Sequence, residues 1–280
     1  MARFAAASMA AVLLALAAGC AGLGERVGRV SLPPGAPSAE EVLRNLAEND
    51  AKIQSFRSAG TFVLISPEFD GIKRYNGNIR FRRPADLYVI GRLRLGITVF
   101  KLACVGQEFL MEFPGSREQS FYQIEGEQFD DVPFSVSPSD IAREMFLPED
   151  WGALKRRDVR VVGFDAAAET AVLSVGDDDR PRRMIELVRV NDQDPKWVAK
   201  KDTRLTDSGD VLAVTTLDEY TNVDGALFPT HVDAYFPTEE TRMTFEMRNV
   251  KLNAEVSDEY FNIRERAREL NLQERQANRP

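Results

Sequence analysis

The sequence is poor in the residues that many enzymes use for metal-dependent or nucleophilic catalysis. Its 280 residues contain one histidine, His231, and two cysteines, Cys20 and Cys104. A single histidine excludes sites built from several histidine ligands and leaves one position for any histidine-based triad. The sequence also lacks a Gly-Xaa-Ser-Xaa-Gly elbow, a P-loop and a dinucleotide-binding fingerprint. We therefore predict no catalytic residues, no metal site and no cofactor.

An excess of positive charge is also missing. The chain has 36 lysine and arginine residues against 44 aspartate and glutamate residues, and its formal net charge is -8. Because nucleic acids attract basic surfaces, we expect no nucleic-acid partner. Hydrophobic residues make up 44% of the chain, which excludes disorder and is enough for one large domain.

An apolar run from Phe4 to Ala18 follows Arg3, and it is too short and too rich in small residues for a membrane span. This pattern predicts a signal peptide over residues 1–19. The signal ends in Leu16-Ala17-Ala18-Gly19-Cys20. That ending resembles the lipobox of bacterial lipoproteins, with alanine in place of the usual leucine.

The lipobox resemblance implies that Cys20 is acylated and anchors the protein in a membrane. Ala21, rather than aspartate, follows the cysteine, which implies the outer membrane. The alternative is an ordinary signal peptide with an incidental cysteine. Residues 20–37 are rich in glycine and proline, so we expect the lipidated cysteine to be followed by a flexible tether.

The folded body is expected to begin with an amphipathic helix over residues 39–56. Ser38 and Glu41 have the spacing of a capping box. Four apolar residues then recur at helical intervals: Val42, Leu46, Ile53 and Phe56.

Alternating polar and apolar residues then predict strands. The clearest pair lies within 72–93, where Pro84 and Asp86 mark the turn between two antiparallel strands. About a dozen strands follow from this pattern over the whole chain. An antiparallel sheet of this size usually curls, because a flat sheet leaves exposed edges and an uncovered apolar face. We therefore expect a mainly β (α+β) fold with one large curved sheet.

A brief second helix is predicted at 137–146, and it could cover the apolar face of the sheet. The expected face and its cover comprise Phe62, Leu64, Ile79, Phe81, Leu87, Val89, Phe109, Met111, Phe113, Met145 and Phe146. One interpretation is a cavity for acyl chains, since such sites are concave and mostly apolar. The other is an ordinary filled core, and periodicity alone does not separate the two.

Arg82 and Arg83 are adjacent in a strand, so their side chains should point to opposite faces. One of them must then lie inward or at the rim, where a guanidinium needs acceptors. The opposing interpretation is two solvated arginines at a strand end. Residues 264–280 form a charged tail with a thin apolar stripe of Ile263, Ala267 and Leu270, which we expect to be solvated or frayed.

Several of these features together resemble the LolA/LolB superfamily of bacterial lipoprotein carriers and receptors. They are the lipobox-like leader, the N-terminal helix, the segment Gly77-Asn78-Ile79-Arg80-Phe81-Arg82-Arg83-Pro84, the short capped helix and the closing Ser257-Asp258-Glu259-Tyr260-Phe261. The resemblance covers about residues 39–263, within an expected domain over 38–263. It implies an unclosed β-barrel with a helical lid over a hydrophobic cavity. It also implies that Arg83 bonds to the lid and releases it on opening.

The resemblance implies a non-catalytic lipoprotein of the cell envelope that faces the periplasm and binds acyl chains of lipoproteins or other lipids. Its expected role is lipoprotein localisation or insertion, with a periplasmic carrier protein as candidate partner. The membrane anchor makes the chain more similar to the LolB receptor than to the soluble carrier. The protruding apolar loop of LolB has no clear counterpart at 112–119, which is polar apart from Phe113. The alternatives are a structural or sensor lipoprotein with a self-filled sheet, and a secreted hydrolase, which lacks a nucleophile motif.

Overall fold

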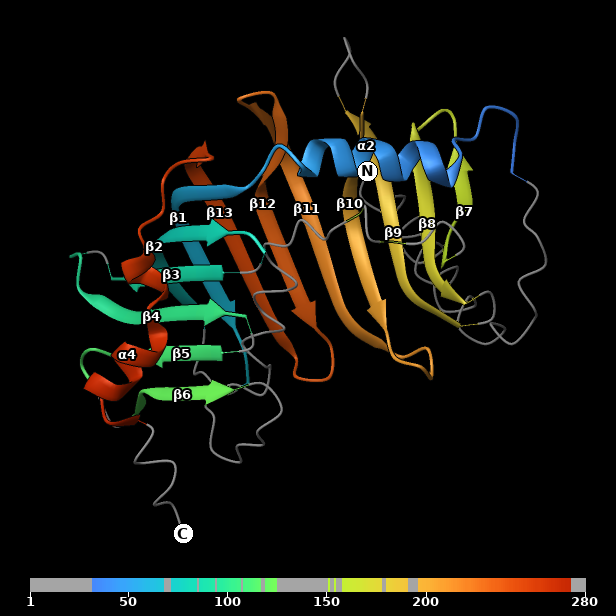
Figure 1. Ribbon diagram of the computed structural model, residues 1–280. Coiled ribbons are helices and arrows are strands. Elements are labelled where there is room, and N and C mark those ends of the chain that lie inside the picture. Colours follow the sequence, from blue (N-terminus) through green and yellow to red (C-terminus); the bar gives the residue numbers. More distant parts are fainter. Residues whose placement is uncertain are drawn as a thin grey trace, which may run out of the picture. The chain divides into compact units, whose positions relative to one another are not determined.

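The computed structural model describes residues 32–67, 72–84, 86–93, 95–106, 108–116, 119–124, 151, 154, 158–177, 180–190 and 196–272. These residues form a single antiparallel sheet of 13 strands with three short helical segments (Figure 1). The helical segments are α2 (Ala39–Asp50), the 3-10 helix η3 (Asp258–Phe261) and α4 (Ile263–Glu269).

The strands, in chain order, are β1 (Ser55–Ile65), β2 (Lys73–Arg82), β3 (Asp86–Arg92), β4 (Thr98–Val105), β5 (Glu108–Glu112), β6 (Phe121–Ile124), β7 (Val159–Asp165), β8 (Thr170–Asp177), β9 (Arg180–Val190), β10 (Lys196–Leu205), β11 (Val211–Val223), β12 (Ala226–Phe236) and β13 (Thr241–Leu252).

Neighbouring strands in the sheet are mostly neighbours in the chain. The order is β6-β5-β4-β3-β2-β1-β13-β12-β11-β10-β9-β8-β7, so two meanders are joined where β1 pairs with β13. Strands β6 and β7 lie at the two ends of this order and do not pair with each other in the described residues. The predicted fold class, an unclosed antiparallel barrel with helical cover, is confirmed.

The two faces of the sheet bury different clusters. We call the face that carries Phe62 and Leu64 the inner face. It holds a central cluster from β1–β5 and β11–β13, and a second cluster where α2 packs on β7–β10. The opposite, outer face is covered at β3–β5 by α4, as Figure 1 shows for the red helix in front of the green strands.

Helix α2 begins where the sequence predicts but ends earlier. The Ser38 hydroxyl accepts a hydrogen bond from the Glu41 amide at 3.1 Å, which confirms the capped start. The helix ends at Asp50 rather than at Phe56, and β1 begins at Ser55. Phe56 instead packs between aromatic rings of other strands, so burial in the sheet overrides the helical spacing.

The C-terminal stripe is buried, which corrects the expectation of a solvated or frayed tail. Ile263, Ala267 and Leu270 pack against Ala103 and Leu110 on the outer face. Isolated helices of this length are marginal in water, so contact with the sheet stabilises α4. Residues 273–280 lie outside the described part of the chain, as does the helix predicted at 137–146.

Candidate functional site

The structure brings the predicted lining residues of the inner face together. The members of this set that lie in one buried cluster, each between 1% and 8% exposed, are Phe62, Leu64, Ile79, Phe81, Leu87, Val89, Phe109 and Met111. Phe113 is partly buried and packs against the same cluster. Met145 and Phe146 lie outside the described residues.

Aromatic rings make up much of this face. The Phe62 ring lies 4.6 Å from the Phe245 ring and 5.8 Å from the Phe100 ring, measured between centroids. Phe56 lies 5.4 Å from Phe81 and 4.9 Å from Phe228. Such pairs stabilise the fold beyond the burial of apolar area, and the contacts of β1 with Phe228 and Phe245 join the two meanders.

Of the 23 buried residues of the inner cluster, 15 are not among the lining residues predicted from the sequence. The missed residues come mainly from β11–β13 and include Phe228, Val232, Phe236, Met243, Phe245 and Met247. The alternation of Met243, Phe245 and Met247 with polar residues was a usable signal. What it did not show is that β13 pairs with β1 and so shares this face with Phe62.

Arg83 joins the β2–β3 turn to the end of α2. Its Nε donates to the Ile53 carbonyl at 2.8 Å, and its Nη2 donates to the Asp50 carbonyl at 3.0 Å. Nη2 also lies 2.5 Å from the Asp50 carboxylate. A cation at the C-terminal end of a helix interacts favourably with the helix dipole. Arg83 therefore ties the only described helix on the inner face to the sheet.

Arg82 points the other way, as expected for adjacent strand residues. Its guanidinium pairs with Asp86 at 2.8 Å and with Asp258, and it lies 4.5 Å from the centre of the Phe261 ring. Each arginine is bound to a different helical segment, while the Arg82 side chain remains 35% exposed and that of Arg83 21%. Arg82 binds η3 and Arg83 binds α2.

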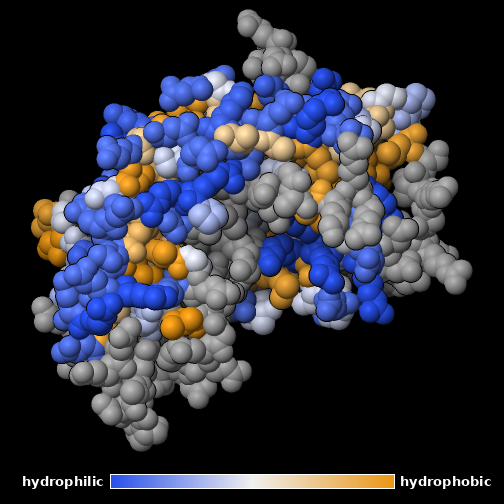
Figure 2. Space-filling model, in the orientation of Figure 1, coloured by the Kyte–Doolittle hydropathy of each residue, from blue (hydrophilic) through white to orange (hydrophobic). Residues whose placement is uncertain are grey.

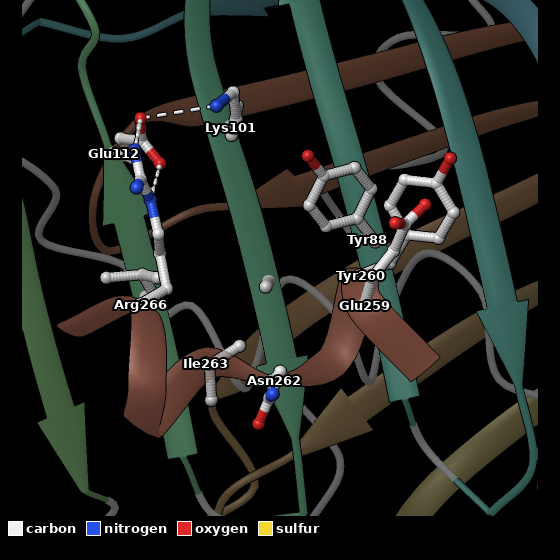
Figure 3. Close-up of a pocket in the computed structure, with 10 residues that line it drawn as sticks. Tyr88, Lys101, Glu112, Glu259, Tyr260, Asn262, Ile263 and Arg266 are labelled. Atoms are coloured by element: carbon white, nitrogen blue, oxygen red, sulfur yellow. Dashed lines mark hydrogen bonds and ion pairs between the residues drawn. The ribbon is translucent and has the colours of Figure 1, made fainter. Parts of the chain in front are cut away.

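A pocket of about 260 Å³ lies on the outer face between the sheet, η3 and α4 (Figure 3). Tyr88, Tyr260 and Glu259 line one side of it, and Lys101, Glu112 and Arg266 line the other. Burial raises the pKa of Tyr88 to about 12.

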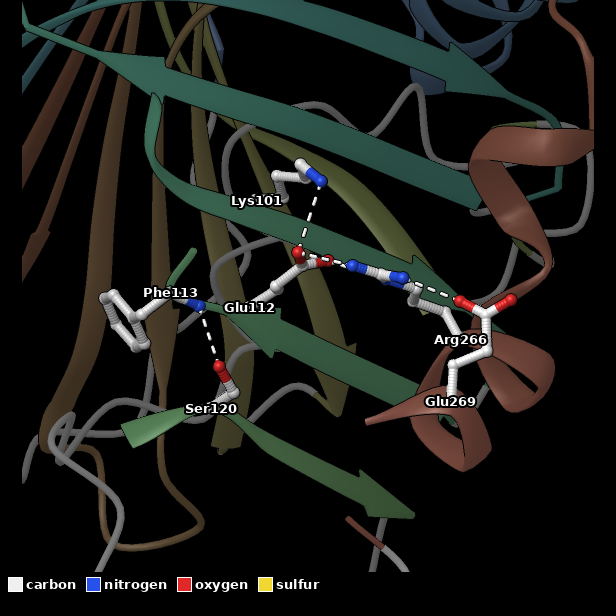
Figure 4. A network of polar contacts seen from close by, with 6 residues as sticks. All are labelled: Lys101, Glu112, Phe113, Ser120, Arg266 and Glu269. Atoms are coloured by element: carbon white, nitrogen blue, oxygen red, sulfur yellow. Dashed lines mark hydrogen bonds and ion pairs between the residues drawn. The ribbon is translucent and has the colours of Figure 1, made fainter. Parts of the chain in front are cut away.

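Glu112 is the centre of an ion network at this pocket (Figure 4). Arg266 binds its two oxygens at 2.8 and 3.0 Å, and Lys101 lies 3.2 Å away. The hydrogen bonds from Arg266 hold the pKa of Glu112 below its usual value, although burial opposes them. Arg266 also binds Glu269 on its own helix at 2.6 Å. The network fastens α4 to β4 and β5.

Exposed apolar residues gather at one end of the sheet. In the β3–β4 loop, Leu93 is 47% exposed, Leu95 89% and Ile97 59%. Ile72, at the start of β2, is 68% exposed, and the register of β2 with β3 places it at the same end. Figure 2 shows hydrophobic surface at the left margin, where Figure 1 places this loop. Among the described residues, these clustered exposed apolar side chains therefore lie in and beside the β3–β4 hairpin.

The two remaining positions considered from the sequence lie in strands. His231 is in β12, as expected, opposite Asp218 and Glu246. Cys104 is buried in the inner cluster, and burial raises the pKa of its thiol. Within the described ranges, no group of three or more histidine, cysteine, aspartate or glutamate residues could hold a metal ion, and no helix could span a membrane.

The sequence and the structure were compared with those of known proteins. No family model matches the sequence, and no curated protein matches it either. A LolA superfamily protein from Nitrosomonas europaea superposes with a TM-score of 0.51 at 14% identity, covering 81% of this chain and 98% of that one. The chain has a LolA-like fold.

Two further structures support this fold at the same coverage of 81% of this chain and 98% of the other. A DUF1329 family protein from Desulfovibrio piger gives a TM-score of 0.53 at 12% identity. A domain from Vibrio parahaemolyticus, described as a candidate outer membrane lipoprotein-sorting protein, gives 0.50 at 9% identity. The expected LolA/LolB-like architecture is confirmed, and at these identities the likeness concerns the fold alone.

Proposed function

We propose that this protein is a non-catalytic, lipid-anchored lipoprotein of the outer membrane that binds acyl chains of lipoproteins or other lipids in its half-barrel. The observation that carries the proposal is the inner face, where apolar side chains from β1–β5 and β11–β13 converge in one cluster. Acyl chains bind through burial of apolar area alone, at roughly 25 cal/mol per Å². A site for them needs no catalytic group.

The inner face is closed in this structure, so binding requires opening. Its predicted lining residues are at most 8% exposed. An acyl chain can enter only where a covering element moves, and a ligand shifts such an equilibrium when it binds the open state better than the closed one. In this proposal the covering elements move and the rigid sheet does not.

Arg83 is the proposed latch. It donates hydrogen bonds to two carbonyls at the end of α2 and pairs with the Asp50 carboxylate. These contacts hold the end of α2 against the β2–β3 turn, so their loss lets the helix end leave the sheet. Hydrogen bonds from a charged group contribute about 1.5–3 kcal/mol each, which suits a contact that is broken reversibly.

The β3–β4 loop is the proposed point of contact with the membrane. Leu93, Leu95 and Ile97 are exposed there and are not members of the inner cluster. Clustered exposed hydrophobic residues mark interaction sites, and a membrane surface suits a loop on a lipid-anchored protein. The tether over residues 20–37 would give the body freedom to bring this loop to the bilayer.

One observation favours the alternative, a structural or sensor lipoprotein that binds a protein partner. The inner side chains are already buried in one cluster, as expected for an ordinary core. In that case the sheet would serve as a scaffold and its outer surface would bind the partner.

Native mass spectrometry of residues 21–280 separates the two. The protein is exposed to envelope lipids and to a purified acylated lipoprotein. A stoichiometric adduct that detergent displaces supports the acyl-chain site. A bare mass, under conditions that load an established carrier, supports the filled scaffold.

A further inference from the structure

Three cations lie directly opposite one another across the outer face. Arg57 of β1 pairs in register with Arg80 of β2 on one side and with Lys251 of β13 on the other. We call Lys251, Arg57 and Arg80 the basic row. Like charges directly opposite in a sheet destabilise it, so the row is costly to the fold in a chain whose net charge is -8.

A β-bulge builds this arrangement. The register of β1 with β13 shifts between Arg57 and Ala59, which pair with Lys251 and Arg248. Asn249, inside the shift, has a positive φ of 55°. Residues three apart on a regular strand point to opposite faces, but here the bulge brings Arg248 and Lys251 to the same face. The Arg248 guanidinium, bonded to the Thr61 hydroxyl at 3.2 Å, adds a fourth cation beside the row.

Cations near the basic row form ion pairs with carboxylates, whereas, among the described residues, the members of the row do not. Arg82 pairs with Asp86 and Asp258, and Arg74 lies 3.7 Å from Glu246. In the part of the chain that the structure describes, no carboxylate forms an ion pair with any member of the basic row.

Arg80 is held by aromatic rings instead of by a carboxylate. Its guanidinium carbon lies 4.1 Å from the centre of the Tyr260 ring and 5.9 Å from that of Tyr88. Its buried Nη1 makes no hydrogen bond within the described residues. The rings fix the position of this cation while leaving its charge unneutralised.

We propose that the basic row is a docking site for the acidic face of a helix of a partner protein. The row has one cation per strand, so the backbones that carry neighbouring cations are about 4.8 Å apart. Residues three and four apart on a helix are about 5–6 Å apart, so carboxylates at i, i+4 and i+7 match this spacing. Charge complementarity of this kind sets the orientation of a partner.

A bilayer fits the row less well than a helix does. The row lies about 26 Å along β1 from the end of the sheet that carries the apolar loop, given about 3.3 Å per residue. A flat membrane that touches Leu95 therefore does not reach it. Arg80 is also overlain by Tyr260 of η3, so a narrow element reaches it more easily than a plane. The docking site is independent of whether the inner face holds acyl chains.

The test uses two synthetic alanine-rich helical peptides of about 20 residues with equal numbers of glutamates. One carries them on a single face, and the other carries them evenly around the helix. The one-face peptide should bind the full chain without its leader at least about fivefold more tightly than the other peptide does. Added salt should weaken the binding of the one-face peptide. Equal binding of both peptides overturns the proposal.

Two double variants complete the test. Arg57→Glu combined with Lys251→Glu should weaken binding of the one-face peptide at least about tenfold. Lys200→Glu with Arg268→Glu changes two exposed cations elsewhere by the same net charge and should leave binding within about twofold. Equal loss in both variants would show attraction to net charge alone and overturn the site.

Two further measurements separate docking from a structural role of Arg57 and from membrane binding. Arg57→Glu alone places a carboxylate between Arg80 and Lys251, so the melting temperature should stay level or rise while peptide binding falls. A fall in both would make Arg57 a structural residue. Vesicles that contain phosphatidylglycerol should show no difference between the wild type and the double variant. Weaker vesicle binding by the double variant would show that the basic row binds the membrane and not a partner helix.

Discussion

Nη2 of Arg83 lies 2.5 Å from the Asp50 carboxylate, and Nε of Arg83 donates a hydrogen bond to the Ile53 carbonyl at 2.8 Å. Asp50 is the last residue of α2, and Arg83 directly follows β2. One side chain therefore joins the end of a helix on the inner face to a turn of the sheet. In the proposed function, loss of this contact frees the end of α2 without removing apolar residues from the inner cluster.

Arg83→Leu should change lipid exchange more than folding. The substitution removes the hydrogen bonds to the Asp50 and Ile53 carbonyls but leaves the inner cluster intact. We expect faster uptake and release of a fluorescent fatty acid, with a smaller relative change in the melting temperature. Arg82→Leu is the control, because it removes the adjacent arginine, which is bound on the outer side. If stability and exchange fall together in Arg83→Leu alone, Arg83 is structural.

Leu95→Asp should weaken contact with membranes without affecting the fold. Leu95 is 89% exposed, and substitutions at such positions usually change stability by no more than about 0.5 kcal/mol. We expect reduced cosedimentation of the unlipidated protein with vesicles and reduced transfer of bound lipid to them. Leu212→Asp, at a partly exposed leucine at the start of β11, is the comparison. Unchanged cosedimentation in Leu95→Asp would remove the loop from the proposal.

The attachment of α4 should weaken at acidic pH. Arg264 lowers the pKa of Glu108, and Arg266 lowers the pKa of Glu112. A carboxylate with a lowered pKa in the folded state stabilises the fold above its unfolded pKa of about 4.3. That contribution is lost as the pH falls from there through the lowered pKa.

Hydrogen exchange of residues 263–272 measures this attachment. Exchange should rise below about pH 4, before the inner strands lose protection. Glu112→Gln should raise exchange at neutral pH and flatten its pH dependence, since a neutral amide cannot titrate. Exchange that is independent of pH in the wild type would show that apolar packing alone holds the helix.

Cys20→Ser should release the protein from the membrane. The prediction rests on the lipobox-like ending at Cys20, which lies outside the described residues. We expect loss of labelling by radioactive palmitate and recovery in the soluble fraction, because one serine cannot carry the acyl chains. Cys104→Ser is the control, because that cysteine is buried in the inner cluster. Palmitate labelling that persists in Cys20→Ser would refute the anchor.

Local patterns in the sequence were sufficient for much of the sheet and for one side of the inner face. Period-2 alternation identified Ile79, Phe81, Leu87 and Val89 as one face, because successive side chains on a strand must point to opposite sides. The capping pair Ser38 and Glu41 located the start of α2, because a capping hydroxyl bonds to an amide of the first helical turn of the same segment.

Long-range contacts decided what the patterns left open. The sequence by itself determined a curved antiparallel sheet, its alternating faces and a capped helix, because these follow from local backbone geometry and side-chain polarity. The tertiary structure alone decided that Phe56 leaves the helix for β1, that Ala267 is buried and that β1 pairs with β13. Each depends on burial between segments far apart in the chain. The basic row is of this kind, since a bulge in β13 brings Lys251 opposite Arg57.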